Sequence, residues 1–340
     1  MNENVIIGRE FRLASRPDGE PTLDDFELAE TRVPDPGEGQ ILVRNTWMSV
    51  DPYMRGRMDD AESYIPPFEL GAPLDGGAIG EVVASRAEGI PVGATVSHFL
   101  GWREYALLDA ASAVVVDTGL ARPQDYLGAL GTTGLTAYLA VTEIARVKEG
   151  DVVFVSAAAG AVGSVAGQLA RQYGAVRVIG SAGGPEKGRT LVETFGFDAA
   201  IDYRAGSLPD RLAEAAPEGI DVYIDNVGGG HLEAAIDAFN DHGRAALVGM
   251  VGEYNAPVPG PRNLYVAVKK RLTLRGVLVS DHLDRFPEYI GKAAGWLADG
   301  TLHTEETVVD GFERAPEAFL GVLKGANTGK MLVRHTTNGN

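Results

Sequence analysis

A glycine-containing turn between a short apolar run and a helical pattern is the first stretch of this chain whose residues could do chemistry. Val152–Ser156 is a β-branched run typical of a buried parallel strand, and Ala158-Ala159-Gly160-Ala161-Val162-Gly163 follows it. Gly160 would let the backbone approach a pyrophosphate, and Gly163 would let the next helix pack against the strand. The helix N-terminus would present free N–H groups to the anion. The stretch predicts a dinucleotide-binding turn, although Ala158 replaces the first glycine of the usual motif; an ordinary strand–helix turn is the alternative.

The residues after the next predicted strand indicate which dinucleotide would bind. NAD-binding sites carry an acidic residue about twenty residues beyond the turn, where it holds the ribose hydroxyls. Here the strand ends in Gly180–Gly184 without a carboxylate, Lys187 follows in the first turn of a helix, and Tyr203 and Arg204 end the third strand. A lysine beside a helix N-terminus, with a phenol nearby, suits a 2′-phosphate. We therefore predict NADP(H) rather than NAD(H); a solvated surface charge at Lys187 is the alternative.

Strands alternating with helices must position these residues. Beyond residue 127 the pattern predicts a doubly wound (Rossmann) fold with a six-stranded parallel sheet. Its strands are expected at Val152–Ala157, Arg177–Ala182, Ala199–Tyr203, Asp221–Val227, Arg244–Met250 and Leu274–Val279. Before residue 127, short strands with glycine punctuation predict a small barrel-like β domain, to which a last strand at Lys330–Arg334 is expected to return. The fold class is thus α/β with a second, β-rich domain.

Length and composition set the frame for this arrangement. The chain has 340 residues, more than one core usually spans, so we expect two domains, 1–126 completed by 303–340, and 127–302. A net charge of −17 argues against nucleic acid or an anionic membrane as partner. No apolar run approaches the ~20 residues of a membrane helix. The start, MNENVIIGREF, lacks the basic region and apolar core of a signal peptide, so we expect a cytoplasmic protein.

Six motifs occur in this chain in the order found in one family. They are SVDPYMRGRM (Ser49–Met58), GTTGLTAY (Gly131–Tyr138), SAAAGAVGSVAGQ (Ser156–Gln168), AGGPEK (Ala182–Lys187), DNVGG (Asp225–Gly229) and GANTGK (Gly325–Lys330). Over nearly its whole length the chain resembles the zinc-independent medium-chain dehydrogenase/reductases of the prostaglandin reductase, plant double-bond reductase and bacterial curcumin reductase group. The resemblance implies an NADPH-dependent alkenal/one oxidoreductase, commonly a homodimer, with an N-terminal GroES-like catalytic domain that the C-terminus completes.

The resemblance also implies individual cofactor contacts. These are Gly160, Ala161, Val162 and Gly163 for the pyrophosphate, Lys187 and Tyr203 for the 2′-phosphate, Asn226 near the ribose, and Val248, Gly249, Met250, Tyr254, Val277, Leu278, Val279 and Asn327 on the nicotinamide side. One departure is Arg204, which stands where relatives often have lysine.

A catalytic metal is not expected. Catalytic zinc needs three protein ligands, typically cysteine, histidine and carboxylate. The chain has no cysteine, its histidines show no H-x-x-H spacing, and Leu74–Ala78 reads Leu-Asp-Gly-Gly-Ala where a zinc enzyme would carry Gly-His-Glu. We expect surface or helix-capping positions for all the histidines. They are His98, His231, His242, His282, His303 and His335.

Without a Lewis acid, conjugate reduction of an enal or enone is easier than reduction of an unactivated ketone. Hydride would attack the β-carbon, the carbonyl oxygen would take the charge as an enolate, and the α-carbon would then be protonated. A phenol, with an ordinary pKa of about 10, stays a hydrogen-bond donor at neutral pH. We predict Tyr254 as the principal donor, directly or through the nicotinamide ribose hydroxyl, and Tyr53 as a second, substrate-binding contact to the carbonyl. The alternatives are a surface-loop tyrosine at Tyr254 and a packed loop aromatic at Tyr53.

Two further regions could shape the substrate site. Tyr64 is a candidate for a pocket wall or lid, and Pro257–Pro261 for a loop that gates the site. Two other functions stay open at this point. One is an NADPH:quinone oxidoreductase of the same superfamily, which the motif at Ser49–Met58 disfavours. The other is a protein that binds NADPH without catalysis, in an interaction role.

Overall fold

The computed structural model describes residues 6–256 and 258–336, so Pro257 of the predicted gating loop lies outside the described residues. The chain forms two compact units. The first unit comprises Met1–Leu127, Glu306–Asn327 and Met331–Asn340, and the second comprises Gly128–Glu305 and Thr328–Lys330. The expected roles, a catalytic domain at 1–126 with 303–340 and a cofactor-binding domain at 127–302, stay a prediction.

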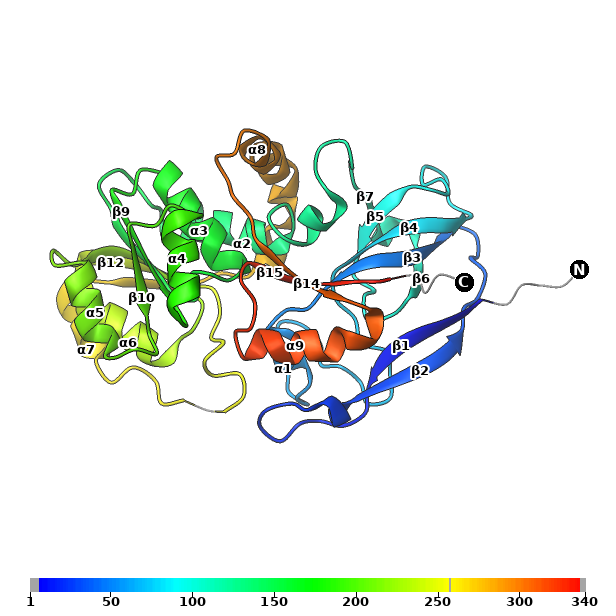
Figure 1. Cartoon of the computed structure of the whole chain (residues 1–340), viewed down its shortest axis with the longest axis horizontal. Coiled ribbons are helices and arrows are strands. Elements are labelled where there is room, and N and C mark those ends of the chain that lie inside the picture. Colours follow the sequence, from blue (N-terminus) through cyan, green and yellow to red (C-terminus); the bar gives the residue numbers. More distant parts are fainter. Residues whose placement is uncertain (1–5, 257, 337–340) are drawn as a thin grey trace, which may run out of the picture. The chain divides into compact units, whose positions relative to one another are not determined.

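Two sheets form most of the first unit, one antiparallel and one mixed, in which β14 and β15 run parallel (Figure 1). Strands β1 (Ile7–Leu13) and β2 (Phe26–Arg32) make a two-stranded sheet, and a seven-stranded sheet has the order β14-β15-β3-β4-β5-β7, with β6 paired to β3. The larger sheet contains β3 (Gln40–Ser49), β4 (Ala78–Ser85), β5 (Thr95–His98), β6 (Tyr105–Asp109), β7 (Val114–Val115), β14 (Glu306–Asp310) and β15 (Lys330–Arg334). The helical segments are α1 (Met54–Arg57), α9 (Ala315–Leu323) and the 3₁₀ turns η1 (Leu23–Asp25), η2 (Ala110–Ser112), η3 (Pro123–Leu127) and η6 (Phe312–Arg314). Strand β15 pairs with β3, which confirms the predicted return of the last strand.

An aromatic cluster explains why the C-terminal part of the chain belongs to this unit. Trp102 is fully buried and stacks on Phe26, with 5.8 Å between the ring centroids. It packs edge-to-face with Phe11 and Phe319, with centroid distances of 6.0 and 6.1 Å. Phe319 lies on α9, so the helix contributes one wall of a core that N-terminal residues begin. Each fully buried aromatic side chain contributes about 1.5–3 kcal/mol relative to an exposed one. Trp102 has a left-handed backbone, with φ of 60°, which this packing holds in place.

Six parallel strands form the sheet of the second unit, as predicted. Their order is β10-β9-β8-β11-β12-β13. The strands are β8 (Val152–Val155), β9 (Arg177–Ala182), β10 (Ala199–Asp202), β11 (Ile220–Asp225), β12 (Phe239–Leu247) and β13 (Thr273–Gly276). The order runs outward from β8 to β10 and then restarts at β11, so the carboxyl ends of β8 and β11 meet at the topological switch point, where such sheets bind ligands.

The helices of the second unit fall into two groups, which Figure 1 shows on opposite sides of the sheet. Right-handed crossovers require this, because the direction of the strand order reverses after β10. The helices are α2 (Thr132–Leu139) with a π-helical turn η4 (Ala140–Ile144), α3 (Ala161–Gln172), α4 (Pro185–Glu193), α5 (Leu208–Ala215), α6 (Gly229–Ala238), α7 (Leu264–Lys270), η5 (Val279–Arg285) and α8 (Phe286–Ala298). Contacts join α2 to α3 and α8 in one group, and α5, α6 and α7 in the other.

The strands end earlier than the sequence predicts. We expected Arg244–Met250 and Leu274–Val279, but β12 ends at Leu247 and β13 at Gly276. Leu247 pairs with Asp225 on one side and with Gly276 on the other, so all three strands stop at the same edge. Apolar residues continue beyond this edge because the loops there are partly buried. The sequence therefore shows no boundary where the hydrogen-bonded ladder ends.

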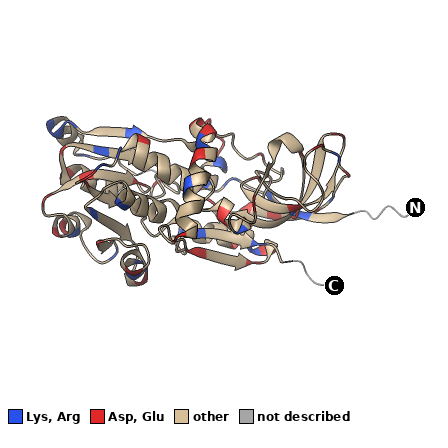
Figure 2. Ribbon diagram, turned by 90° about the horizontal axis from the view of Figure 1, so that it is seen from above, with Lys and Arg blue, Asp and Glu red and all other residues tan. Residues whose placement is uncertain are grey.

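Charges of both signs are distributed over the helices and strands of each unit (Figure 2). Asp and Glu outnumber Lys and Arg by 47 to 30, so the excess is acidic. Within residues 6–256 and 258–336, no helix has the length and apolar character that crossing a membrane requires.

Candidate functional site

The turn after β8 leaves helix-start N–H groups without a side-chain partner. Gly160 is the N-cap of α3, and no side chain caps the helix. A Cβ on Gly163 would lie 2.5 Å from the Ala157 carbonyl oxygen, so a side chain there would push the helix away from the turn. The first N–H groups of α3, from Ala161, Val162 and Gly163, have no acceptor within the helix. The structure thus brings the four predicted pyrophosphate residues together in a turn suited to an anion.

Two cationic side chains, Lys187 and Arg204, lie beyond the ends of β9 and β10. The Arg204 guanidinium lies against Gly183, where a Cβ would be 2.8 Å from its Cζ and Nε atoms. Burial and the charge of Arg204 both lower the pKa of Lys187. The Arg204 guanidinium also lies 5.6 Å from the centre of the Tyr203 ring. Two cations close enough to repel each other, beside an exposed phenol, fit a phosphate dianion that would relieve the repulsion.

Asp202 fixes the backbone around these cations, and we did not identify this residue from the sequence. Its carboxylate accepts hydrogen bonds from the N–H groups of Gly184 and Arg204, both at 3.0 Å. These bonds lower the pKa of Asp202 and tie the glycine turn after β9 to the end of β10. The signal was present, because Asp202 stands near the end of the predicted strand Ala199–Tyr203 and directly precedes Tyr203.

The loop after β11 is anchored on a buried carboxylate that we also missed. Asp225 is fully buried, and burial raises its pKa. Its Oδ1 atom accepts hydrogen bonds from the Tyr223 hydroxyl (2.8 Å) and from the N–H groups of Val227 (3.0 Å) and Gly228 (2.9 Å). Asn226, expected near the ribose, donates its amide Nδ2 to the Ser156 carbonyl at 2.7 Å, which links the ends of β11 and β8.

The predicted donor Tyr254 folds back onto the loop that follows β12. The N–H groups of Val248 and Gly249 donate to the Asp225 carbonyl at 2.8 and 3.1 Å. The Tyr254 hydroxyl lies over Gly249, 3.3 Å from where a Cβ would stand, and forms a hydrogen bond with the Met250 backbone. Burial raises the pKa of Tyr254, and the Met250 bond only partly opposes this. The phenol therefore keeps its proton at neutral pH and is not the exposed loop tyrosine of the alternative interpretation.

The remaining residues expected on the nicotinamide side follow β13 or lie near the C-terminus. The Val277 N–H donates to the Leu247 carbonyl at 3.1 Å, Leu278 is exposed, and Val279 begins η5. Asn327 belongs to the first unit, directly before the three residues that return to the second. Their contact with a cofactor stays a prediction.

In the first unit, the other predicted tyrosine carries a buried hydroxyl without a partner. Tyr53 precedes α1, and its hydroxyl oxygen has no hydrogen-bond partner in the part of the chain that the structure describes. Burial, and then the charge of Asp51, raises the pKa of Tyr53 well above its ordinary value. Tyr64 is 60% exposed and also acts electrostatically on Tyr53. A buried donor without an acceptor is costly, so it marks a place where a ligand could bind.

The segment that carries Tyr53 is more ordered than a polar loop. Met54–Arg57 form the short helix α1, and Met54 and Met58 are buried in the core. Arg57 forms a two-pronged ion pair with Asp75, and its guanidinium lies 3.9 Å from the Phe68 ring centre. Because its charged groups are paired inside the unit, the segment packs and holds Tyr53 in one position.

The expectation for the histidines is wrong at His231 and His335, which carry buried ring nitrogens, and at His98. This side chain is buried, its Nδ1 atom accepts from the Leu100 N–H at 3.1 Å, and its Nε2 atom lies 2.9 Å from Asn45 Oδ1. Since Nδ1 accepts, Nε2 carries the proton and donates to Asn45. Burial lowers the pKa of His98 to about 3, so the ring is neutral. Across the described residues, no three His, Asp or Glu side chains are grouped as a metal site would require.

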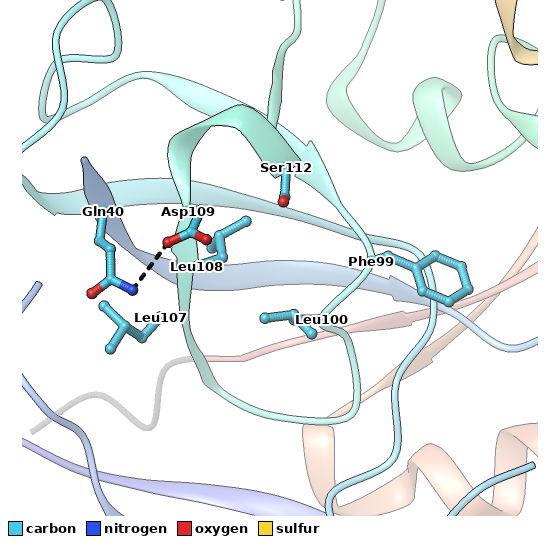
Figure 3. A pocket seen from close by; sticks show the side chains of 7 residues that line it. All are labelled: Gln40, Phe99, Leu100, Leu107, Leu108, Asp109 and Ser112. Carbon is cyan, nitrogen blue, oxygen red and sulfur yellow. Dashed lines mark hydrogen bonds between the residues drawn. The ribbon is translucent and has the colours of Figure 1, made fainter. Parts of the chain in front are cut away.

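A surface hollow of about 340 Å³ lies in the first unit, between β3, β6 and the segment after β5. Figure 3 shows its lining side chains, among them Gln40 and Asp109, which form a 3.1 Å hydrogen bond. None of the predicted site residues lines it.

Curated proteins match nearly the whole length of this chain. It is 44% identical to a putative NADP-dependent oxidoreductase, YfmJ, of Bacillus subtilis, over 96% of this chain and 97% of that protein. It is 39% identical to the NADPH-dependent curcumin reductase of Escherichia coli, over 98% of this chain and 99% of that protein. The chain belongs to the medium-chain dehydrogenase/reductase family. Two family models match, described as the N-terminal domain of oxidoreductase (residues 9–116) and zinc-binding dehydrogenase (residues 161–295).

Among solved structures, a member of this family resembles the whole chain. It is CurA from Vibrio vulnificus in complex with NADPH, which is 39% identical. The match has a TM-score of 0.92 and covers 97% of this chain and 99% of that one.

Proposed function

We propose that this protein is an NADPH-dependent reductase that saturates the carbon–carbon double bond of α,β-unsaturated aldehydes and ketones without a metal. The observation that carries the proposal is Tyr53, a buried hydroxyl with a raised pKa and no acceptor among the described residues. Such a group is a permanent donor for an oxygen that a ligand brings. The carbonyl of an enal or enone is an oxygen of this kind, and the family resemblance supports this substrate class.

The residues of the second unit fit NADP(H). The uncapped start of α3 at Gly160–Gly163 would bind the pyrophosphate, and Lys187, Tyr203 and Arg204 the 2′-phosphate. Asn226 would lie near the ribose. The nicotinamide side would be lined by Val248, Gly249, Met250, Tyr254, Val277, Leu278, Val279 and Asn327. When bound, NADPH supplies the hydride.

Two phenols would then handle the charge and the proton of the substrate. As hydride adds to the β-carbon, the C=C electrons shift and negative charge gathers on the carbonyl oxygen. Tyr53 donates a hydrogen bond to that oxygen, and Tyr254 acts as the principal donor, directly or through the ribose hydroxyl. Protonation at the α-carbon completes the reaction. Burial raises both pKa values, which keeps both groups protonated at neutral pH. Tyr64 would form part of the pocket wall.

The test is NADPH oxidation with a panel of alkenals, alkenones and quinones, repeated with NADH and with a chelator. We expect turnover of enals and enones, a strong preference for NADPH over NADH, and no effect of the chelator. Turnover of quinones alone would contradict the proposed substrate class. No turnover with any of the three classes would contradict an enzymatic role and favour a binding protein. Loss of activity with the chelator would contradict the metal-free mechanism.

A homodimer and a cytoplasmic location also stay predictions. Support for the dimer comes from the second unit, where α7 exposes Tyr265 and Val268, at 70% and 69%, on the helix that precedes the edge strand β13 in the chain. Sedimentation analysis tests it, and a monomer at assay concentrations would contradict it.

A further inference from the structure

Near its C-terminus the chain enters the second unit for three residues. Thr328–Lys330 belong to that unit, whereas the residues on both sides belong to the first. The Gly329 N–H donates a hydrogen bond of 2.7 Å to the Ala159 carbonyl, and Gly160 and Gly329 form a parallel backbone bridge. Ala159 and Gly160 immediately precede α3. A distant part of the sequence therefore holds the turn in which we place the pyrophosphate.

The turn depends on such contacts because its own conformation is unfavourable. Ala157 has a φ of 45°, a left-handed backbone that costs a non-glycine residue about 1 kcal/mol or more. The turn is tied at two other points, by the Ala158 N–H to the Ser181 carbonyl and by the Gly160 N–H to the Ala157 carbonyl, both at 2.9 Å. The bond from Gly329 fixes the peptide group between Ala159 and Gly160. It thereby sets the direction of the first N–H groups of α3.

Position 329 has room for a glycine only. Its φ is 65°, and a Cβ would lie 1.7 Å from the Glu305 carbonyl oxygen and 2.4 Å from its carbon. The Lys330 N–H donates to this same oxygen at 2.9 Å, so the Glu305 backbone cannot move aside without losing a hydrogen bond. Any side chain at 329 must therefore displace the segment from Glu305, and with it the N–H that holds Ala159.

We infer that Thr328–Lys330 is a brace for the pyrophosphate-binding turn and that Gly329 is its positioning residue. Gly329 acts through Ala159 and need not touch the cofactor. The inference rests on the proposed function, since it assumes that NADPH binds at α3.

The test compares Gly329→Ala with Gly300→Ala. Both glycines lie in the second unit with left-handed backbones (φ of 65° and 75°), but a Cβ on Gly300 meets nothing within 4 Å. The control therefore reproduces the backbone strain without the clash. For each variant we would measure the Kd and KM of NADPH, the KM of an enone, and the inhibition constant of 2′-AMP, which carries the 2′-phosphate but no pyrophosphate.

We expect Gly329→Ala to weaken NADPH binding by about tenfold or more, the effect of losing about one hydrogen bond. The inhibition constant of 2′-AMP and the KM of the enone should stay within about twofold, as should every value for Gly300→Ala. Unchanged NADPH affinity in a folded Gly329→Ala protein would overturn the inference, and so would equal losses for NADPH and 2′-AMP, which indicate general damage.

Hydrogen exchange of the wild-type protein decides the matter if Gly329→Ala does not fold. NADPH should increase the protection of the Gly329 amide, and 2′-AMP should not. Unchanged protection of the Gly329 amide on addition of NADPH would overturn the inferred brace. A wild-type protein that binds no NADPH would refute the proposed function itself. A wild-type protein that binds NADPH but not 2′-AMP would refute only the assignment of the 2′-phosphate site. The comparison of Gly329→Ala with Gly300→Ala would still test the brace.

Discussion

Replacing Tyr53 by phenylalanine should make the protein more stable and less active at the same time. The Tyr53 hydroxyl is buried and has no hydrogen-bond partner among the described residues. A buried polar group without a partner costs about 1–3 kcal/mol, and phenylalanine removes this cost while keeping the ring. We expect the free energy of unfolding to rise by about 1 kcal/mol, the low end of that range, because the unit relaxes partly around an unpaired group.

The same substitution should slow the reaction. In the proposed mechanism the hydroxyl donates to the oxygen on which negative charge develops. Removing one donor of this kind lowers kcat by about 10²–10³ in a well-studied oxyanion site. Tyr254 remains as a donor here, so we expect a fall of about tenfold to a hundredfold, with a smaller change in the KM of the enone.

Urea denaturation of the cofactor-free protein measures the stability, and steady-state kinetics with saturating NADPH measures kcat and KM. Tyr265→Phe is the control, because its side chain is 70% exposed and has no part in the proposed site, so its replacement should leave both quantities nearly unchanged. An unchanged kcat in Tyr53→Phe would refute the catalytic role. If the free energy of unfolding of Tyr53→Phe fell by about 1 kcal/mol or more, the hydroxyl would not be a destabilising, unpaired group in the free protein.

Three further predictions follow from individual side chains. Tyr254→Phe should lower kcat by about tenfold or more while changing the Kd of NADPH much less, and unchanged turnover would remove Tyr254 from the mechanism. Lys187→Ala should lower kcat/KM for NADPH by about tenfold or more and leave kcat/KM for NADH unaffected, because only NADPH carries the 2′-phosphate. Arg189→Ala, at an exposed position of the same helix, is the control. An unchanged ratio of the two kcat/KM values in Lys187→Ala would contradict the proposed 2′-phosphate site. For His98, burial lowers the pKa to about 3 in the folded protein, below the value of about 6.5 in the unfolded chain. Above about pH 6.5 the ring is neutral in both states and costs no stability. As the pH falls below about 6.5, only the unfolded chain takes up a proton, so the free energy of unfolding decreases. Between about pH 7 and pH 5 the loss is about 2 kcal/mol, and denaturation of His98→Gln should show a pH dependence weaker by that amount; an identical pH dependence would contradict it.

The parts of the site that the sequence predicted are those with a strong local cause. Gly160 and Gly163 follow an apolar run, and a side chain at Gly163 would collide with the turn that precedes the helix. Lys187 stands out because no carboxylate occupies the tip of the strand before it. The six-stranded sheet followed from alternation alone. Strand ends could not be predicted, because a ladder stops where its partner stops, and that depends on residues far away in the sequence.

The contacts that the sequence did not predict join distant residues. Asp202 and Asp225 lie within predicted strands, and nothing local shows that each accepts hydrogen bonds from N–H groups of turns. His98 reads as a surface histidine because its partner Asn45 lies 53 positions away. Gly329 reads as a turn residue, and its bond to Ala159 spans about half the chain. Only the folded backbone shows which of these groups meet.

Some polar groups in this protein are paired with each other, and others meet no partner of their own kind among the described residues. Arg57 with Asp75, and His98 with Asn45, satisfy each other inside the first unit, so folding alone accounts for them. Among the described residues the Tyr53 hydroxyl has no hydrogen-bond partner, and burial with the charge of Arg204 lowers the pKa of Lys187. In the proposed site a carbonyl oxygen would accept from Tyr53, and a phosphate would bind Lys187 and Arg204 together. Trp102 Nε1 and the ring nitrogens of His335 also lack a partner among the described residues, so the unpaired hydroxyl of Tyr53 supports the proposal only together with the motif at Ser49–Met58.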